Sequence, residues 1–176
     1  MKKLFGTDGI RGVAGEYPLD DRTVYAVGLA VAHSLRGEGG AAKVLLGMDT
    51  RESSERIAGL LTAGLTAGGA SVESAGVITT PAVAFLTREH GFAAGVVISA
   101  SHNPWRDNGI KLFGPDGYKL PDAVEMRVEE EIFRRVEEGG EAPEAKGMEV
   151  NEADRAAYVR SLLRRCRGCR WMGARW

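Results

Sequence analysis

The sequence predicts an α/β fold in which helices cover both faces of a mainly parallel, mixed sheet. Segments with the apolar spacing of helices alternate with short strand-like runs between residues 20 and 98, which favours parallel strand pairing. The run Val-Val-Ile at 96–98 is β-branched throughout, as in a strand buried on both faces. At 176 residues and with ordinary globular composition, the chain is long enough to form one such domain with its own core.

Caps, apolar spacing and glycine stops divide the chain into elements. The glycine-rich stretch 6–12 is expected to be a surface turn or backbone laid close to a ligand, and His90 is expected to cap the C-terminal end of a helix. The remaining expected elements are, in chain order, a helix capped by Asp20 or Asp21 and stopped by Gly37, a strand over 43–47, a helix capped by Ser53 or Ser54 and running to about Thr66, a strand over 70–74, a helix capped by Thr79 and running to about Glu89, the strand at 96–98, a second apolar run over 110–113, a hairpin flanking 114–117, a helix capped by Asp122 and running to about Glu138, and a last helix from Asn151 toward Leu163.

Charge and composition exclude several classes of function. The formal net charge of −1 gives the chain no overall attraction to nucleic acid or to an anionic membrane. No apolar stretch approaches the ~20 residues of a membrane span, and the N-terminus lacks the apolar segment of a signal peptide. The sequence therefore predicts a cytoplasmic protein with no nucleic-acid or membrane partner, and it leaves the oligomeric state open.

The polar loop directly after the strand at 96–98 is the main candidate for a functional site, because open α/β sheets bind ligands at such strand ends. Three interpretations of this loop are open. It is an ordinary turn, since Asn-Pro and Asn-Gly are turn dipeptides. It is a serine hydrolase site, which the lack of a Gly-x-Ser-x-Gly elbow disfavours. Or Ser101 carries a phosphoryl group, for which His102, Asn103 and Lys111 supply the polar and cationic neighbours that a phosphoserine needs.

Two motifs resemble those of a known enzyme family. Ser-Ala-Ser-His-Asn-Pro at 99–104, followed by Asp-Asn-Gly-Ile-Lys-Leu-Phe at 107–113, resembles the phosphoserine loop of the α-D-phosphohexomutases. Lys-Leu-Phe-Gly-Thr-Asp-Gly-Ile-Arg-Gly at 3–12 resembles the opening of the phosphoglucosamine mutase branch of that family. The resemblance runs from residue 1 to about Leu163, and it implies the fold of the first of the family's four domains.

The resemblance also implies an activity, namely the interconversion of glucosamine 6-phosphate and glucosamine 1-phosphate through a phosphoserine and a bisphosphorylated sugar. This reaction would serve amino-sugar nucleotide and cell-wall precursor synthesis. Mg²⁺ would bind the phosphate on Ser101, and glucose or glucosamine 1,6-bisphosphate would activate the enzyme. The residues that match the family's site are Ser101, His102 and Lys111 as catalytic residues, and Arg11, Asn103 and Arg51 as phosphate- or substrate-binding residues. The alternative for Arg51 is a surface ion pair with Asp49, which contributes little.

The sequence departs from the family in three motifs. The metal loop Asp-Gly-Asp-Gly-Asp-Arg, the sugar-recognising Gly-Glu-x-Ser-Gly and the phosphate loop Arg-x-Ser-Gly-Thr-Glu-Pro do not occur in it. We therefore expect this chain by itself to be inactive. The alternative to an enzyme is a first-domain fragment that binds at most phosphate or a partner, and specificity for mannose or glucose phosphates also stays open.

Three segments are expected along the chain. They are a phosphohexomutase-like first domain at 1–150, a connector helix at 151–163, and a basic, disordered tail at 164–176 that arises by truncation or a change of reading frame. The tail contains Cys166 and Cys169, which lack the further ligands that a zinc site needs.

Overall fold

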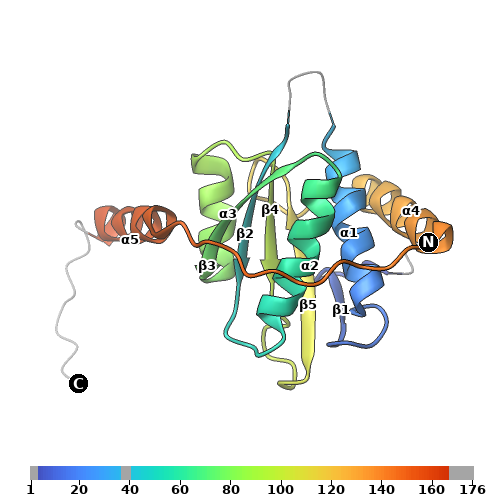
Figure 1. The fold of residues 1–176 in the computed structure, drawn as a ribbon. Coiled ribbons are helices and arrows are strands. Elements are labelled where there is room, and N and C mark those ends of the chain that lie inside the picture. Colours follow the sequence, from blue (N-terminus) through green and yellow to red (C-terminus); the bar gives the residue numbers. More distant parts are fainter. Residues whose placement is uncertain (1–3, 37–40, 167–176) are drawn as a thin grey trace.

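The structure is a computed structural model in which residues 4–36 and 41–166 are described. One five-stranded sheet runs through the molecule, with helices on both of its sides (Figure 1). The elements are, in chain order, β1 Ile10–Val13, α1 Asp21–Ser34, β2 Lys43–Met48, α2 Ser54–Ala67, β3 Ser71–Val77, α3 Thr80–Glu89, β4 Ala94–Ile98, β5 Asp107–Phe113, α4 Asp122–Glu138 and α5 Glu152–Cys166.

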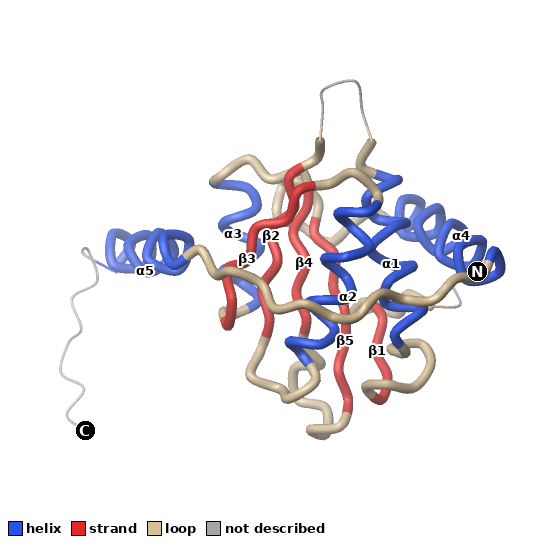
Figure 2. Tube along the Cα trace, in the orientation of Figure 1, coloured by secondary structure: helices blue, strands red, loops and turns tan. Residues whose placement is uncertain are grey.

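The strands lie in the order β1-β5-β4-β2-β3 (Figure 2). β2 pairs in parallel with both β3 and β4, whereas β5 is antiparallel to both of its neighbours, β4 and β1. Since β1 reverses the direction of β5 again, four of these five strands run the same way. The predicted mixed, mainly parallel sheet is confirmed. β5 is the exception because a short loop, and no crossover helix, joins it to β4.

Alternate residues of the central strands face two separate parts of the core. Val44 and Leu46 of β2 pack in the larger part, together with α1, α2 and α4. Leu45 packs on the other side with Val83 and Leu86 of α3. Because both sides are buried, these strands are largely apolar on both faces. The prediction of helices on both faces is confirmed.

Three segments near the sheet differ from the sequence prediction. The stretch 6–12, expected as a turn or loop, contributes β1, in which Ile10 pairs with Ile110 of β5. Residues 107–109, whose Asn-Gly pair also fits a turn, are the beginning of β5, so that strand starts earlier than the apolar run at 110–113. The hairpin at 114–117 has its turn, but its second arm is only an isolated bridge between Phe113 and Lys119.

The helix ends lie close to the predicted residues, and the predicted cap positions of α1, α2 and α3 are confirmed, whereas that of α4 is wrong. Asp20 caps α1 by accepting a hydrogen bond from the N–H three residues later, as expected. Ser53 and Thr79 occupy the cap positions of α2 and α3, yet neither hydroxyl forms a capping hydrogen bond. Pro121, and not Asp122, precedes α4. The Ser53 hydroxyl instead accepts a hydrogen bond from the side-chain amide of Asn108.

The last helix, α5, is longer than expected. Residues 164–166 were expected in a disordered tail, but they are helical, because arginine is a good helix former and its charge is favourable in the last turn. The rest of the expected tail, including Cys169, lies outside the described residues. Asp154 holds α5 to the body through the ring of His90, at 3.0 Å between Oδ1 and Nδ1. His90 ends α3, as predicted, and also links α3 to α5.

Helices α1 and α2 cross with their backbones in contact at two glycines. A Cβ atom on Gly64 would lie 2.2 Å from the carbonyl oxygen of Tyr25, and one on Gly28 would lie 2.4 Å from the carbonyl oxygen of Leu61. Within the described part of the chain, no helix has the length and apolar character needed to cross a membrane.

Gly64→Ala should destabilise the domain, because the added methyl group forces the two helices apart. Overpacking of this kind costs about 1–3 kcal/mol. Urea unfolding of both proteins measures the difference. Gly147→Ala is the matched control, since a Cβ atom there meets no atom within 4 Å. Equal stability of the two variants would contradict the close crossing.

Candidate active site

The candidate site lies where β2 and β4 end next to one another. These strands are parallel neighbours, so the loops that follow them meet at the same edge of the sheet. The N–H of Asp49 donates to the carbonyl of Ile98, the last residue of β4, at 3.0 Å. The depression between the loops is lined by residues that include Asp49, Arg51, Ser99, Ser101 and Asn103.

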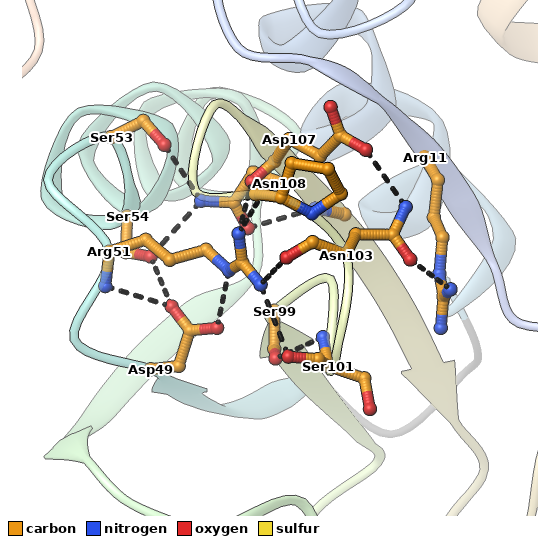
Figure 3. Close-up of polar contacts among 12 residues, drawn as sticks. Arg11, Asp49, Arg51, Ser53, Ser54, Ser99, Ser101, Asn103, Asp107 and Asn108 are labelled. Carbon is orange, nitrogen blue, oxygen red and sulfur yellow. Dashed lines mark hydrogen bonds and ion pairs between the residues drawn. The ribbon is translucent and has the colours of Figure 1, made fainter.

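Ser101 has an unusual backbone conformation. Its φ is +59°, and among the described residues other than glycine it alone has a positive φ. Its N–H donates to the hydroxyl of buried Ser99 at 3.0 Å, while its own exposed hydroxyl forms no hydrogen bond to any described residue (Figure 3). A non-glycine residue in this region costs about 1–3 kcal/mol. The contacts around the loop must therefore hold Ser101 in place.

Arg51 supplies most of those contacts, although it lies fifty residues earlier in the chain. Its Nε donates to Asp49 Oδ2 at 3.1 Å. Its Nη1 donates to the carbonyls of Pro104 and Asp107, at 2.6 and 2.9 Å, and its Nη2 donates to the carbonyls of Ser101 and Asn103, at 3.1 and 2.9 Å (Figure 3). A guanidinium has five N–H donors, and all of these are used.

The structure therefore changes the role predicted for Arg51. No N–H of its guanidinium is left for a phosphate, and we assign it the role of positioning the loop. The alternative, an ion pair with Asp49, is present at 3.1 Å, but it is not a surface pair, because the Arg51 side chain is only 12% exposed. The sequence shows the Asp49–Arg51 spacing but not the four carbonyl groups that converge on this guanidinium.

Asp49 is the anionic partner of this arrangement. Burial alone would raise the pKa of the Asp49 carboxyl. Hydrogen bonds from Ser99, from the Arg51 N–H, from Ser54 and from the Arg51 guanidinium outweigh burial and hold that pKa below its ordinary value of 3.8. Asp49 is thus a carboxylate at neutral pH and is oriented for Arg51.

Asn108 supports the loop through buried hydrogen bonds, and the sequence analysis did not identify it. Its side chain is fully buried, and its amide Nδ2 donates to Ser53 Oγ and Ser54 Oγ at 2.9 and 3.1 Å. Ser54 Oγ in turn donates to Asp49 Oδ1 at 2.8 Å. These bonds connect the beginning of β5 to the beginning of α2. The sequence feature that could have identified Asn108 is a polar residue directly before the apolar residues of a strand, but the Asp-Asn-Gly sequence also fits a turn.

A second chain of hydrogen bonds leads from the loop to β1. The Asn103 amide donates from Nδ2 to Asp107 at 2.9 Å, and its oxygen accepts from Arg11 Nη1 at 3.2 Å. Arg11 also lies near Asp8, at 3.5 Å, and its buried Nε has no hydrogen-bond partner among the described residues. The structure thus brings Arg11 and Asn103 together beside Ser101, with donor capacity left on Arg11 for an anion.

The two other predicted catalytic residues have fewer contacts. His102 follows Ser101 in the loop and is exposed. Lys111 lies on β5 opposite Val97 and is partly buried. Within residues 4–36 and 41–166, neither side chain forms a hydrogen bond or an ion pair with the loop.

The described residues do not make a complete magnesium site. They contain no group of three or more His, Cys, Asp or Glu side chains placed to hold a metal ion. The nearby carboxylates of Asp49 and Asp107 are engaged by Arg51 and Asn103. A phosphate on Ser101 would supply one ligand.

Comparison with known proteins identifies the family. Residues 2–139 match the model of "Phosphoglucomutase/phosphomannomutase, alpha/beta/alpha domain I". The structure is similar to that of a putative phosphomannomutase from Thermus thermophilus, with a TM-score of 0.75, 29% identity, and coverage of 92% of this chain and 35% of that one. The chain therefore belongs to the phosphoglucomutase/phosphomannomutase family and contains its domain I.

Within the family, the chain is similar to proteins named phosphoglucosamine mutase. It is 54% identical over 170 residues to the one from Koribacter versatilis (strain Ellin345), and the match covers 93% of this chain and 37% of the relative. It is 53% identical over 161 residues to the one from Solibacter usitatus (strain Ellin6076), and that match covers 92% of this chain and 36% of the relative. The chain thus spans somewhat more than a third of these relatives' length.

Arg51→Lys should loosen the loop without unfolding the domain. A lysine has three donors on one nitrogen and cannot bind all five acceptors to which the planar guanidinium of Arg51 donates. Losing even two net hydrogen bonds, at about 1 kcal/mol each, predicts at least tenfold faster amide hydrogen exchange at Ser101 and Asn103. Arg56→Lys, at an exposed ion pair with Asp21, is the control and should leave exchange unchanged. Unchanged exchange in Arg51→Lys would contradict the positioning role.

Asp49→Asn should lower stability in a pH-dependent way. Because the folded-state pKa of Asp49 is lowered, its stabilising contribution is present above its ordinary value of 3.8 and is lost as the pH falls through the lower folded value. The stability difference between wild type and variant, from urea unfolding, should be full at pH 7 and shrink below about pH 3.8. Exposed Glu144→Gln is the control, for which no difference is expected. A difference that stays constant down to about pH 2 would show that the charge of Asp49 is unimportant.

Proposed function

We propose that this chain is the phosphoserine-carrying domain of a phosphoglucosamine mutase. The observation that supports the proposal is Ser101, whose exposed hydroxyl is presented by a left-handed backbone that Arg51 holds in place. Its position on a loop between buried strands fits a group that must meet a substrate repeatedly in one geometry. The names of the relatives favour glucosamine phosphate as substrate.

In the proposed reaction, Ser101 gives up and regains one phosphoryl group. The bond between Ser101 Oγ and phosphorus breaks while a hydroxyl oxygen of the sugar monophosphate bonds to that phosphorus, and the hydroxyl proton passes to a base. The bisphosphorylated sugar then reorients, Ser101 Oγ bonds to the phosphorus of its other phosphate, and the bond from that phosphorus to the sugar oxygen breaks while this oxygen takes back a proton. Catalysis of such a transfer consists mainly of positioning and charge neutralisation.

The remaining roles are those that the family resemblance implies. Arg11, whose side chain is 22% exposed, and Asn103 would bind phosphate beside Ser101. Lys111 would act as general acid and base or as a phosphate anchor, and His102 would shape the loop. Mg²⁺ at the Ser101 phosphate would neutralise charge, with its other ligands from outside the described residues. Activation by glucose or glucosamine 1,6-bisphosphate, a cytoplasmic location and a role in cell-wall precursor synthesis belong to the same proposal.

Two alternatives differ in substrate or in chemistry. One is phosphomannomutase or phosphoglucomutase specificity, which the Thermus structure's name favours. The other is a domain that binds phosphate or a partner without catalysis. Competition among glucosamine, mannose and glucose phosphates for an active protein distinguishes the alternative specificity from the main proposal. Labelling of Ser101 distinguishes a binding domain without catalysis from the main proposal.

Phosphoserine mapping tests the proposal in a chimaera of residues 1–163 with the remaining polypeptide of the Koribacter versatilis enzyme. After incubation with phosphate-labelled glucose 1,6-bisphosphate, the label should lie on Ser101, and Ser101→Ala should abolish labelling and conversion of glucosamine 6-phosphate. Ser99→Ala removes the acceptor for the Ser101 N–H and a hydrogen bond to Asp49, but leaves the Ser101 hydroxyl in place. It should keep the label and lower turnover about 3- to 10-fold. Label on Ser99, or conversion that survives Ser101→Ala, would contradict the assignment. The chain alone should convert no substrate.

A further inference from the structure

A hollow of about 380 Å³ lies between α3 and α5, and none of its lining residues belongs to the candidate active site (Figure 1). Its lining from α5 recurs at helical spacing, so these side chains share one side of the helix; they are Ala157, Arg160, Ser161, Arg164 and Arg165. Phe85, Glu89 and His90 of α3 form the opposite wall. Ala157 and Ser161 lie in the middle of the α5 side and are small, so that they leave the space between the helices open.

Arginine side chains give this hollow a positive charge. Arg160, Arg164 and Arg165 carry three positive charges against the one negative charge of Glu89, which leaves a formal excess of two when His90 is neutral. Within the described residues, Arg160 and Arg164 form no hydrogen bond and no ion pair. Like charges four residues apart on a helix repel each other. An anion bound between these two guanidinium groups would offset that repulsion.

Two of the cationic side chains are held in place by neighbours. The Arg165 guanidinium lies over the ring of Phe85, 5.7 Å from the ring centroid. The Nδ1 atom of His90 lies 3.0 Å from Oδ1 of buried Asp154, which leaves Nε2 as the ring nitrogen available to a ligand. Donors that are already fixed lose less conformational entropy when a ligand binds. The hollow is therefore partly preorganised.

The donors in the hollow suit a phosphate ligand better than a carboxylate ligand. Each guanidinium offers five N–H donors in a planar fork that matches carboxylate and phosphate oxygens. Three such groups exceed what the two oxygens of one carboxylate can accept. A diphosphate group has more oxygens and enough negative charge to offset the formal excess of two. The volume of the hollow also falls within the range of about 300–1,000 Å³ that is typical of small-molecule sites.

We propose that the hollow between α3 and α5 binds a diphosphate group, either as free pyrophosphate or as part of a nucleotide. Arg160, Arg164 and Arg165 would bind its oxygens, and His90 would donate from Nε2 when its ring is protonated. This site is separate from the phosphate-binding residues beside Ser101, and the proposal does not depend on the mutase reaction.

Titration of the ¹⁵N-labelled chain with pyrophosphate, followed by nuclear magnetic resonance at low salt without metal ions, tests the proposal. The signals of residues 160–165 and of His90 should shift and saturate with a Kd below about 1 mM. Arg160→Gln and Arg164→Gln should each raise this Kd about tenfold, because each removes charge-assisted hydrogen bonds. Glutamine is a good helix former, so both variants should keep α5.

Two control variants separate this site from other sources of binding. Arg155→Gln removes an arginine that lies on the opposite side of α5 and pairs with Glu152 at 3.0 Å, and it should change the Kd less than about twofold. Arg11→Gln alters the candidate active site and should leave the shifts of α5 unchanged. A parallel titration with ADP distinguishes the two sources of a diphosphate group, since binding of either ligand at α5 supports the proposal and their relative affinity shows which is preferred.

Three results would overturn the proposal. The first is the absence of saturable shifts in α5 with both pyrophosphate and ADP. The second is an equal loss of affinity in Arg155→Gln and Arg164→Gln, which would indicate attraction to the general charge of the helix. The third is sulfate binding as tightly as pyrophosphate at the same ionic strength, because a site for a diphosphate group should bind the smaller anion about tenfold more weakly.

Discussion

The geometry of the candidate site depends on one guanidinium group. Arg51 joins the loop after β2 to the loop after β4 through four hydrogen bonds to carbonyl groups between Ser101 and Asp107, and a fifth hydrogen bond, to Asp49 in its own loop, orients the guanidinium. Charge-assisted hydrogen bonds of this kind are about twice as strong as neutral ones. Together they offset the cost of the left-handed conformation at Ser101. Without these hydrogen bonds, few contacts would stabilise that conformation of the loop.

A buried polar layer under the loop makes the arrangement rigid. Asn108 binds both serines at the beginning of α2, and Ser54 binds the carboxylate that orients Arg51. Such networks are stable only when nearly every member has a partner, and this one is almost complete. Rigid support is what a phosphoryl-carrying serine requires, because the reaction depends on position more than on chemistry supplied by the protein.

The sequence predicts the central strands, all five helices of the described residues and the loop, but not how the loop is held in place. β2, β3 and β4 could be found because burial on both faces leaves short, largely apolar runs between the helical segments. β1 was missed because an edge strand of four residues that includes a glycine has no such pattern, and its pairing with β5 comes from residues almost one hundred positions away. The role of Arg51 was missed because its partners are backbone carbonyls, which every residue has. Only the fold shows that four of them face one side chain.

The most direct test of the positioning role of Arg51 is the backbone conformation of Ser101 in solution. Chemical shifts and the ³J coupling between HN and Hα of Ser101 report its φ by nuclear magnetic resonance. We expect the values of a single left-handed residue with φ near +59°. Values of an extended or right-handed residue, or averaging among several conformations, would show that Arg51 does not hold the loop as described.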